Sequence, residues 1–121
     1  MSPKLALTIG AVVALLAGLG FTLAPAQLLL RFGGATPTEA ILVTRDLGVT
    51  LVGLGVLNWL ARDVTGPAVR AILVGNLLIQ AGELVADTWE VVAAIKPPQA
   101  AGGIVLHLSL GVVFLLALRR A

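Results

Sequence analysis

The sequence predicts an all-α integral membrane protein built as a four-helix bundle, and three observations predict it. Of its 121 residues, 59% are hydrophobic and 12% are charged, whereas soluble domains carry about 25% charged residues. The mean hydropathy is +1.06. The apolar residues gather in four runs, each close to the roughly 20 helical residues that cross the hydrocarbon layer. The length predicts a single domain, residues 1–121.

The four predicted helices cover residues 5–24, 41–61, 68–95 and 102–118. Lys4, the apolar run after it and the segment LAPA together resemble a secretory signal peptide. The run is longer than a usual signal core, so we expect a helix that is retained. Pro25 ends this helix, and residues 26–32 are too short to span, which predicts an amphipathic turn at the membrane interface.

The later helices are separated by proline and glycine. Thr38 is the predicted N-cap of the second helix. The turn RDVTGP separates the second helix from the third, and Pro97 and Pro98 cannot continue the third. An even number of spans places both termini on one side. That side carries five of the eight basic residues, Lys4, Arg62, Arg70, Arg119 and Arg120, against Arg31, Arg45 and Lys96 on the other. The positive-inside rule therefore predicts that both termini lie in the cytoplasm.

One helix carries an unusual polar stripe, in the segment GNLLIQAGELVADTWE. Its polar residues are spaced 4, 3, 4 and 3 apart, which keeps them within about 80° of the helix surface; they are Asn76, Gln80, Glu83, Asp87 and Glu90. An ionisable group inside the membrane costs at least about 2.5 kcal/mol. The stripe must therefore face other helices or water, while Trp89 falls on the opposite, lipid-facing side.

Helical rise predicts that acids and a histidine from three helices lie in the same outer half of the bilayer. We therefore predict a polar pocket with catalytic candidates Glu83, Asp46, His107 and Asp87, supported as ligand-binding residues by Arg45, Thr50, Asn76 and Gln80. Arg31 and Lys96 are candidate countercharges at its rim. Glu90 is expected to be a solvated end residue, and Asn58 a local hydrogen-bonding residue.

The residue types limit the chemistry. There is no cysteine, and a single histidine among scattered carboxylates lacks the spacing of a metal site. The sequence has no basic run with interleaved aromatic residues, so it does not predict nucleic-acid binding. A carboxyl group and a base can still exchange protons with a substrate without a cofactor. We therefore predict a protein that binds a small lipophilic molecule in the outer half of the bilayer, at a site that could also act on it by isomerisation, cyclisation or epoxide opening.

Two other functions remain open at this point. A membrane carboxyl group could carry a proton in a small transporter, which would then be a homo-oligomer with a central pathway. The polar stripe could instead dock a helix of a partner protein, in a membrane subunit without catalytic activity. An enzyme predicts a closed pocket within one chain and loss of turnover in Glu83→Gln, whereas a docking subunit predicts a stripe that is exposed in the isolated chain and covered in a complex.

Two segments resemble a known group of proteins. In LAGLGFTLAPAQLLLRFGG (15–34) an apolar helix ends in proline and a short amphipathic turn, and in TRDLGVTLVGLGVLNWLA (44–61) the next helix opens with arginine and glycine. This order resembles the small bacterial four-helix membrane proteins of the broad DoxX-like kind. The resemblance implies a four-helix bundle and assigns no functional residue.

Overall fold

The computed structural model describes residues 1–121 and consists of helices joined by short turns. The long helices are α1 (Pro3–Leu23), α3 (Thr38–Ala61), α4 (Pro67–Val92) and α5 (Gly102–Leu118). Two short helices, α2 (Pro25–Arg31) and the 3-10 helix η1 (Pro98–Ala101), precede α3 and α5. Four helical segments, with η1 and α5 counted as one, are long and apolar enough to cross a membrane. The chain is therefore a multi-pass helical membrane protein, as the sequence predicts.

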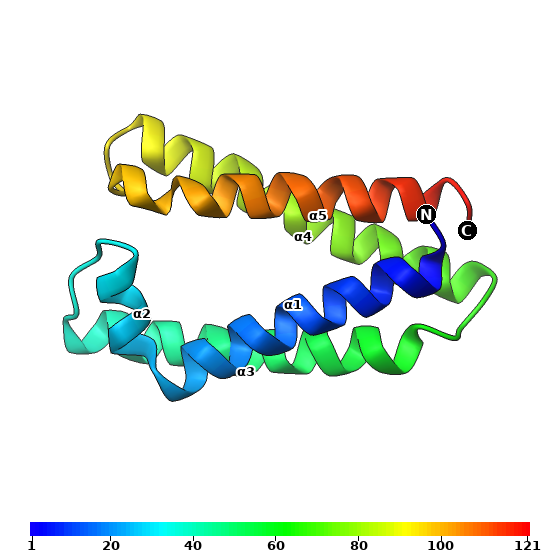
Figure 1. Ribbon diagram of the computed structural model, residues 1–121, viewed down its shortest axis with the longest axis horizontal. Helices are drawn as coiled ribbons and strands as arrows, with labels where there is room; N and C mark the ends of the chain where they lie inside the picture. Colours follow the sequence, from blue (N-terminus) through cyan, green and yellow to red (C-terminus); the bar gives the residue numbers. More distant parts are fainter.

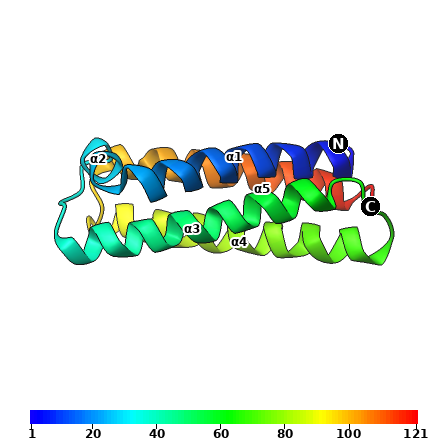
Figure 2. The same ribbon diagram turned by 90° about the horizontal axis from the view of Figure 1, so that it is seen from below.

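The bundle consists of two antiparallel hairpins. Helix α1 packs along α3, and α4 packs along α5. Figure 1 shows that the hairpins approach each other near the chain termini and diverge toward α2. In the perpendicular view of Figure 2, α1 runs level with α5 and α3 runs level with α4, and each of these pairs is in contact over only part of its length. The two hairpins are thus held together mainly at one end of the molecule.

The buried apolar core explains why the hairpins meet at that end. Its residues come from the start of α1, the end of α3, the start of α4 and the end of α5: Ala6, Leu7, Ala61, Val69, Leu73, Leu110, Phe114 and Ala117. No residue of this core lies in the half of the molecule where α2 is found. In that half the polar side chains of α4 and α5 take the place of an apolar core.

Glycine lets α1 and α3 approach closely. A Cβ atom at Gly18 would lie 2.7 Å from the Val52 nitrogen, and one at Gly55 would lie 2.7 Å from Leu15 Cγ. Gly10 in turn faces the Phe114 ring. Small residues at such crossings allow the close backbone contact that stabilises helix pairs in membranes.

The predicted ends of two helices differ from the structure. Helix α3 begins at Thr38, three residues before the predicted start at residue 41. Pro37, not Thr38, is the N-cap of α3, and no side chain caps this helix. Helix α4 ends at Val92, three residues before the predicted end. The reason is a Schellman motif, in which Ala94 takes a φ of 56° and the Ile95 N–H donates to the Glu90 carbonyl. The motif reverses the chain and brings the next residues back toward the last turn of α4.

Candidate functional site

A connected set of polar side chains joins α4, α5 and the turn between them. Gln80 Oε1 lies 2.8 Å from His107 Nδ1. On the other side of the imidazole, His107 Nε2 lies 3.8 Å from Asp87 Oδ2. Asp87 Oδ1 accepts a hydrogen bond of 2.7 Å from Lys96 Nζ, and Lys96 also pairs with Glu90. We call these five residues the polar chain of the α4–α5 hairpin.

The polar chain runs from the buried middle of the hairpin toward its solvent end. Exposed fractions of the charged side chains rise along it, from 11% for Asp87 to 42% for Lys96. The His107 side chain, 21% exposed, remains open to contact from outside the hairpin. Gln80 is buried, and its exposed fraction is 7%. The chain therefore connects a shielded amide to a solvated ammonium group.

Glycine on α5 creates the space that Asp87 fills. A Cβ atom at Gly103 would collide with Asp87 Oδ2. The neighbouring Gly102 has no heavy atom within 4 Å of the same position. Of the two glycines that open α5, Gly103 is the one that lets the Asp87 carboxylate lie against this helix, one turn before His107.

The contact with Gln80 bears on which ring nitrogen of His107 can accept a proton. Gln80 Oε1 can only accept a hydrogen bond, so this contact is a hydrogen bond when His107 Nδ1 carries the hydrogen. In the neutral ring Nε2 then has a free lone pair, and this atom is the one that faces Asp87. A proton that binds Nε2 would form an ion pair with Asp87.

The turn residue Lys96 is a strong cation at the open end of the chain. Burial works to lower the pKa of Lys96, but hydrogen bonds from its ammonium group to Asp87 and Glu90 outweigh burial, and the pKa is raised above its ordinary value. Two carboxylates face this single ammonium group. While His107 is neutral, the polar chain carries one excess negative charge, which a proton on His107 would balance.

A second polar contact links the two hairpins. Asn58 of α3 and Asn76 of α4 exchange two hydrogen bonds, of 2.9 and 2.8 Å, and both side chains are buried. Asn76 also donates to the Ile72 carbonyl of its own helix. The expectation that Asn58 bonds only locally is wrong, because its amide reaches across to α4 at the level where the hairpins still touch.

The structure brings together only part of the predicted pocket. Gln80, Asp87 and His107 meet in the polar chain, but the Glu83 side chain is exposed and has no hydrogen-bonding or ion-pair partner in the chain. Glu83 lies about 40° around α4 from Asp87, on the side of Asn76. That side faces the first hairpin, and the hairpins have already diverged at this level.

The predicted contributions of α3 lie away from the polar chain. Asp46 and Thr50 are exposed, and the Thr50 hydroxyl donates to the Asp46 carbonyl of the same helix. Arg45 Nε donates to the Thr22 carbonyl of α1 at 3.4 Å. Asp46 projects about 160° away from Gly48, which contacts α1. The outer face of α3 therefore holds these residues, and they do not contact α4 or α5.

The structure also differs from two predictions about the rim of the pocket, those for Glu90 and Lys96. Glu90 is not a free solvated residue, because it shares Lys96 with Asp87. Lys96 belongs to the polar chain itself, whereas the sequence predicted only a countercharge at the rim of the pocket. No spacing rule could reveal this, since the reversal at Ala94 places Lys96 beside the helix that precedes it.

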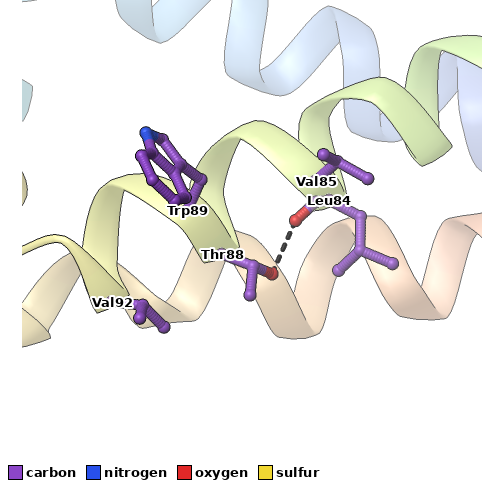
Figure 3. A pocket seen from close by; sticks show the side chains of 5 residues that line it. All are labelled: Leu84, Val85, Thr88, Trp89 and Val92. Carbon is purple, nitrogen blue, oxygen red and sulfur yellow. Dashed lines mark hydrogen bonds between the residues drawn. The ribbon is translucent and has the colours of Figure 1, made fainter.

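One hollow of the surface lies away from the polar chain. Figure 3 shows it on the outward face of α4, lined by Leu84, Val85, Thr88, Trp89 and Val92. Its one hydroxyl, on Thr88, is bonded to the Leu84 carbonyl. Trp89 is 67% exposed, as expected for a lipid-facing residue. No group of three or more His, Cys, Asp or Glu side chains is placed to hold a metal ion.

The fold and the polar chain together define the class, a multi-pass helical membrane protein with an acid–imidazole–amide site inside one hairpin. No protein-family model, curated protein or solved structure matches the chain. The likeness to DoxX-like proteins therefore stays a prediction.

Proposed function

We propose that this protein binds a small lipophilic molecule with a polar head group beside His107 and Asp87, and that the pair exchanges a proton with it. The observation that supports this is the oriented imidazole: Gln80 holds Nδ1, and Nε2 faces the Asp87 carboxylate at 3.8 Å. This separation is longer than a hydrogen bond. Nε2 is therefore free to take a proton from a ligand or to give one to it.

The surroundings favour a ligand that arrives through the bilayer. Apart from Lys96 in the turn, the polar chain lies within membrane-spanning helices, and the hairpins diverge on the same side of the bundle. A hydrocarbon tail can lie among exposed apolar side chains while its head group reaches His107. If the bound molecule reacts, a proton on Nε2 acts as the general acid and Asp87 stabilises the imidazolium.

Calorimetry in lipid nanodiscs tests the proposal, with decanoic acid as the probe and decane as the probe without a head group. The polar chain already carries excess negative charge, so we expect decanoate to bind with uptake of a proton by His107. Proton uptake makes the binding heat depend on the ionisation heat of the buffer. The variant His107→Gln should lose this dependence and bind at least tenfold more weakly. Equal, buffer-independent binding by both proteins would contradict the proposal.

Ser109→Ala provides the matched control for this measurement. Ser109 is exposed on the same helix, and its hydroxyl donates only to the Val105 carbonyl of that helix. We expect this variant to bind decanoate as the wild type does. Loss of binding in Ser109→Ala as well would indicate general disturbance of α5.

Exposed acids support a second candidate function, a subunit that docks a partner helix. Glu83 lies in a membrane span with no partner in the chain, and an unpaired charge there costs at least about 2.5 kcal/mol. A cationic residue of a partner helix would remove this cost. Under this alternative, Glu83→Gln weakens assembly with a partner and leaves decanoate binding unchanged.

We further propose that the chain resides in a bacterial inner membrane with cytoplasmic termini, because most basic residues lie at the end of the bundle that holds both termini. The absence of cysteine makes this testable with single cysteines and a membrane-impermeant maleimide. Thr65→Cys in the turn after α3 should react only from the cytoplasmic side, and Thr36→Cys before α3 only from the opposite side. The reverse labelling pattern would contradict the orientation.

A further inference from the structure

The outer face of α3 carries two opposite charges that the chain itself leaves unpaired. Arg45 and Asp46 are both exposed, and neither forms an ion pair within the chain. The side-chain bond of Arg45 goes from Nε to a backbone carbonyl, which leaves the rest of its guanidinium group free. No hydrogen bond uses the Asp46 carboxylate, since Thr50 bonds the Asp46 backbone oxygen.

Both charges lie at a depth where lipid cannot solvate them. They are on average four residues from the middle of a 24-residue helix, which is about 6 Å along the axis, within a hydrocarbon layer of about 30 Å. Ionisable residues inside a membrane face a partner or water and not lipid. The exposed face of α3 therefore requires a partner surface that supplies one positive and one negative charge.

The apolar residues between the two charges form one narrow seam. Taken at about 100° per residue, five positions without a polar side chain lie between Arg45 and Asp46 around the helix, in addition to Thr38 at its first turn; they are Leu42, Val49, Gly53, Val56 and Leu60. The four side chains of the seam are 45–71% exposed. A Cβ atom at Gly53 would meet nothing within 4 Å. The seam is thus free in the single chain, and the charges flank it on either side.

We propose that a second copy of this chain covers this face, in a parallel dimer through the α3 seam with reciprocal Arg45–Asp46 ion pairs. A twofold axis along the membrane normal keeps equal residues at equal depth. It also places the side of one seam that carries Arg45 beside the side of the other seam that carries Asp46. Arg45 of each copy therefore meets Asp46 of the other. The face is self-complementary, as an isologous interface requires.

The position of the charges along α3 selects the parallel arrangement. In an antiparallel pair centred on the helix middle, Arg45 and Asp46 of opposite copies would be about 12 Å apart along the axis. That separation is too large for an ion pair. Only copies inserted in the same orientation pair both charges at once, so a dimer with mixed orientation is not expected.

A charge exchange tests the pairing. We expect full-length protein labelled at Thr65→Cys to give energy transfer between copies in lipid vesicles. Arg45→Asp and Asp46→Arg should each weaken self-association at least tenfold, because like charges then face each other. A mixture of these two variants should restore energy transfer, since every cross-pair is again opposite in sign. Restoration in the mixture also shows that both variants fold.

Glu83→Arg is the control for surface charge. It reverses an exposed acid on α4, away from the seam, and should leave energy transfer unchanged. Monomeric wild-type protein at every lipid dilution, or no restoration in the mixture, would overturn the proposal. Equal loss of association in Glu83→Arg would assign the interface to another face.

Crosslinking tests the face and the orientation together. Leu42 lies on the seam, whereas the adjacent Val43, also exposed, points about 100° further around the helix. Leu42→Cys should form a disulfide-linked dimer in membranes and Val43→Cys should not. In an antiparallel pair the two Leu42 positions would lie about 22 Å apart, so failure of Leu42→Cys to crosslink would contradict the parallel dimer.

Discussion

Asp87 and Lys96 stand on opposite sides of the turn that ends α4, and their Oδ1 and Nζ atoms are 2.7 Å apart. The Schellman motif at Ala94 creates this contact by reversing the chain. The ion pair closes the polar chain at its open end and leaves Asp87 Oδ2 turned toward His107. The geometry of the site thus depends on a turn, although most of its residues belong to helices.

The first prediction concerns the loss of Lys96. Lys96→Met keeps the length of the side chain but leaves Asp87, only 11% exposed, without its cation. An unsatisfied, mostly buried partner costs about 1–3 kcal/mol, so unfolding by denaturing detergent should begin at a lower concentration. Lys4→Met is the control, because the Lys4–Asp63 pair has side chains 65% and 58% exposed. Exposed pairs contribute little, and equal destabilisation by both variants would contradict the role of Lys96.

The pH dependence of stability follows from the same residue. Hydrogen bonds to the two carboxylates outweigh burial and raise the pKa of Lys96 in the folded protein. A raised folded pKa gives stability that is complete below the unfolded value of about 10.4 and is lost as pH rises through the folded value. The melting temperature should therefore fall in this alkaline range. Lys96→Arg should resist this fall, since guanidinium stays charged; an identical fall in both proteins would assign it to other groups.

The contact between Asn58 and Asn76 predicts strong coupling between two substitutions. Asn58→Leu alone leaves the buried Asn76 amide without its partner across the hairpins and should destabilise the protein by about 1–3 kcal/mol. Asn58→Leu combined with Asn76→Leu removes both amides and should cost less than the sum of the single changes. A double-mutant cycle measures this coupling. Additive effects would mean that the two amides act independently.

The two glycines at the start of α5 give a matched pair of variants. Gly103→Ala places a methyl group where Asp87 Oδ2 lies, whereas Gly102→Ala meets nothing within 4 Å. We expect Gly103→Ala to displace the carboxylate, destabilise the protein by about 1–3 kcal/mol and weaken decanoate binding. Gly102→Ala should change neither property. Wild-type behaviour of Gly103→Ala would show that the position of Asp87 is not important for the site.

Much of the fold is readable in the sequence, because hydropathy and helix-breaking residues determine where helices of a membrane protein begin and end. The spacing of Asn76, Gln80 and Asp87 also predicts correctly that one face of α4 is turned inward. Which helix each residue meets is not readable. Asp46 and Glu83 share a depth with His107, but depth does not give direction, and the hairpins diverge where these residues lie.

Lys96 and Asn58 show a second limit of sequence reasoning. Lys96 joins the site through a left-handed backbone conformation at an alanine, a residue type that rarely adopts it. Asn58 joins the two hairpins only because the α3–α4 crossing places it opposite Asn76. Both contacts depend on three-dimensional packing that leaves no periodic signal in the sequence.

The most direct test of the central claim is the tautomer of His107 in the neutral state. His107 is the single histidine of the chain, so nitrogen-15 solid-state spectra in lipid report this ring alone. We predict hydrogen on Nδ1, donated to Gln80, and a free lone pair on Nε2 facing Asp87. The variant Gln80→Leu should lose this preference. Hydrogen on Nε2 in the neutral wild-type ring would contradict the account, because the atom facing Asp87 could then accept no proton.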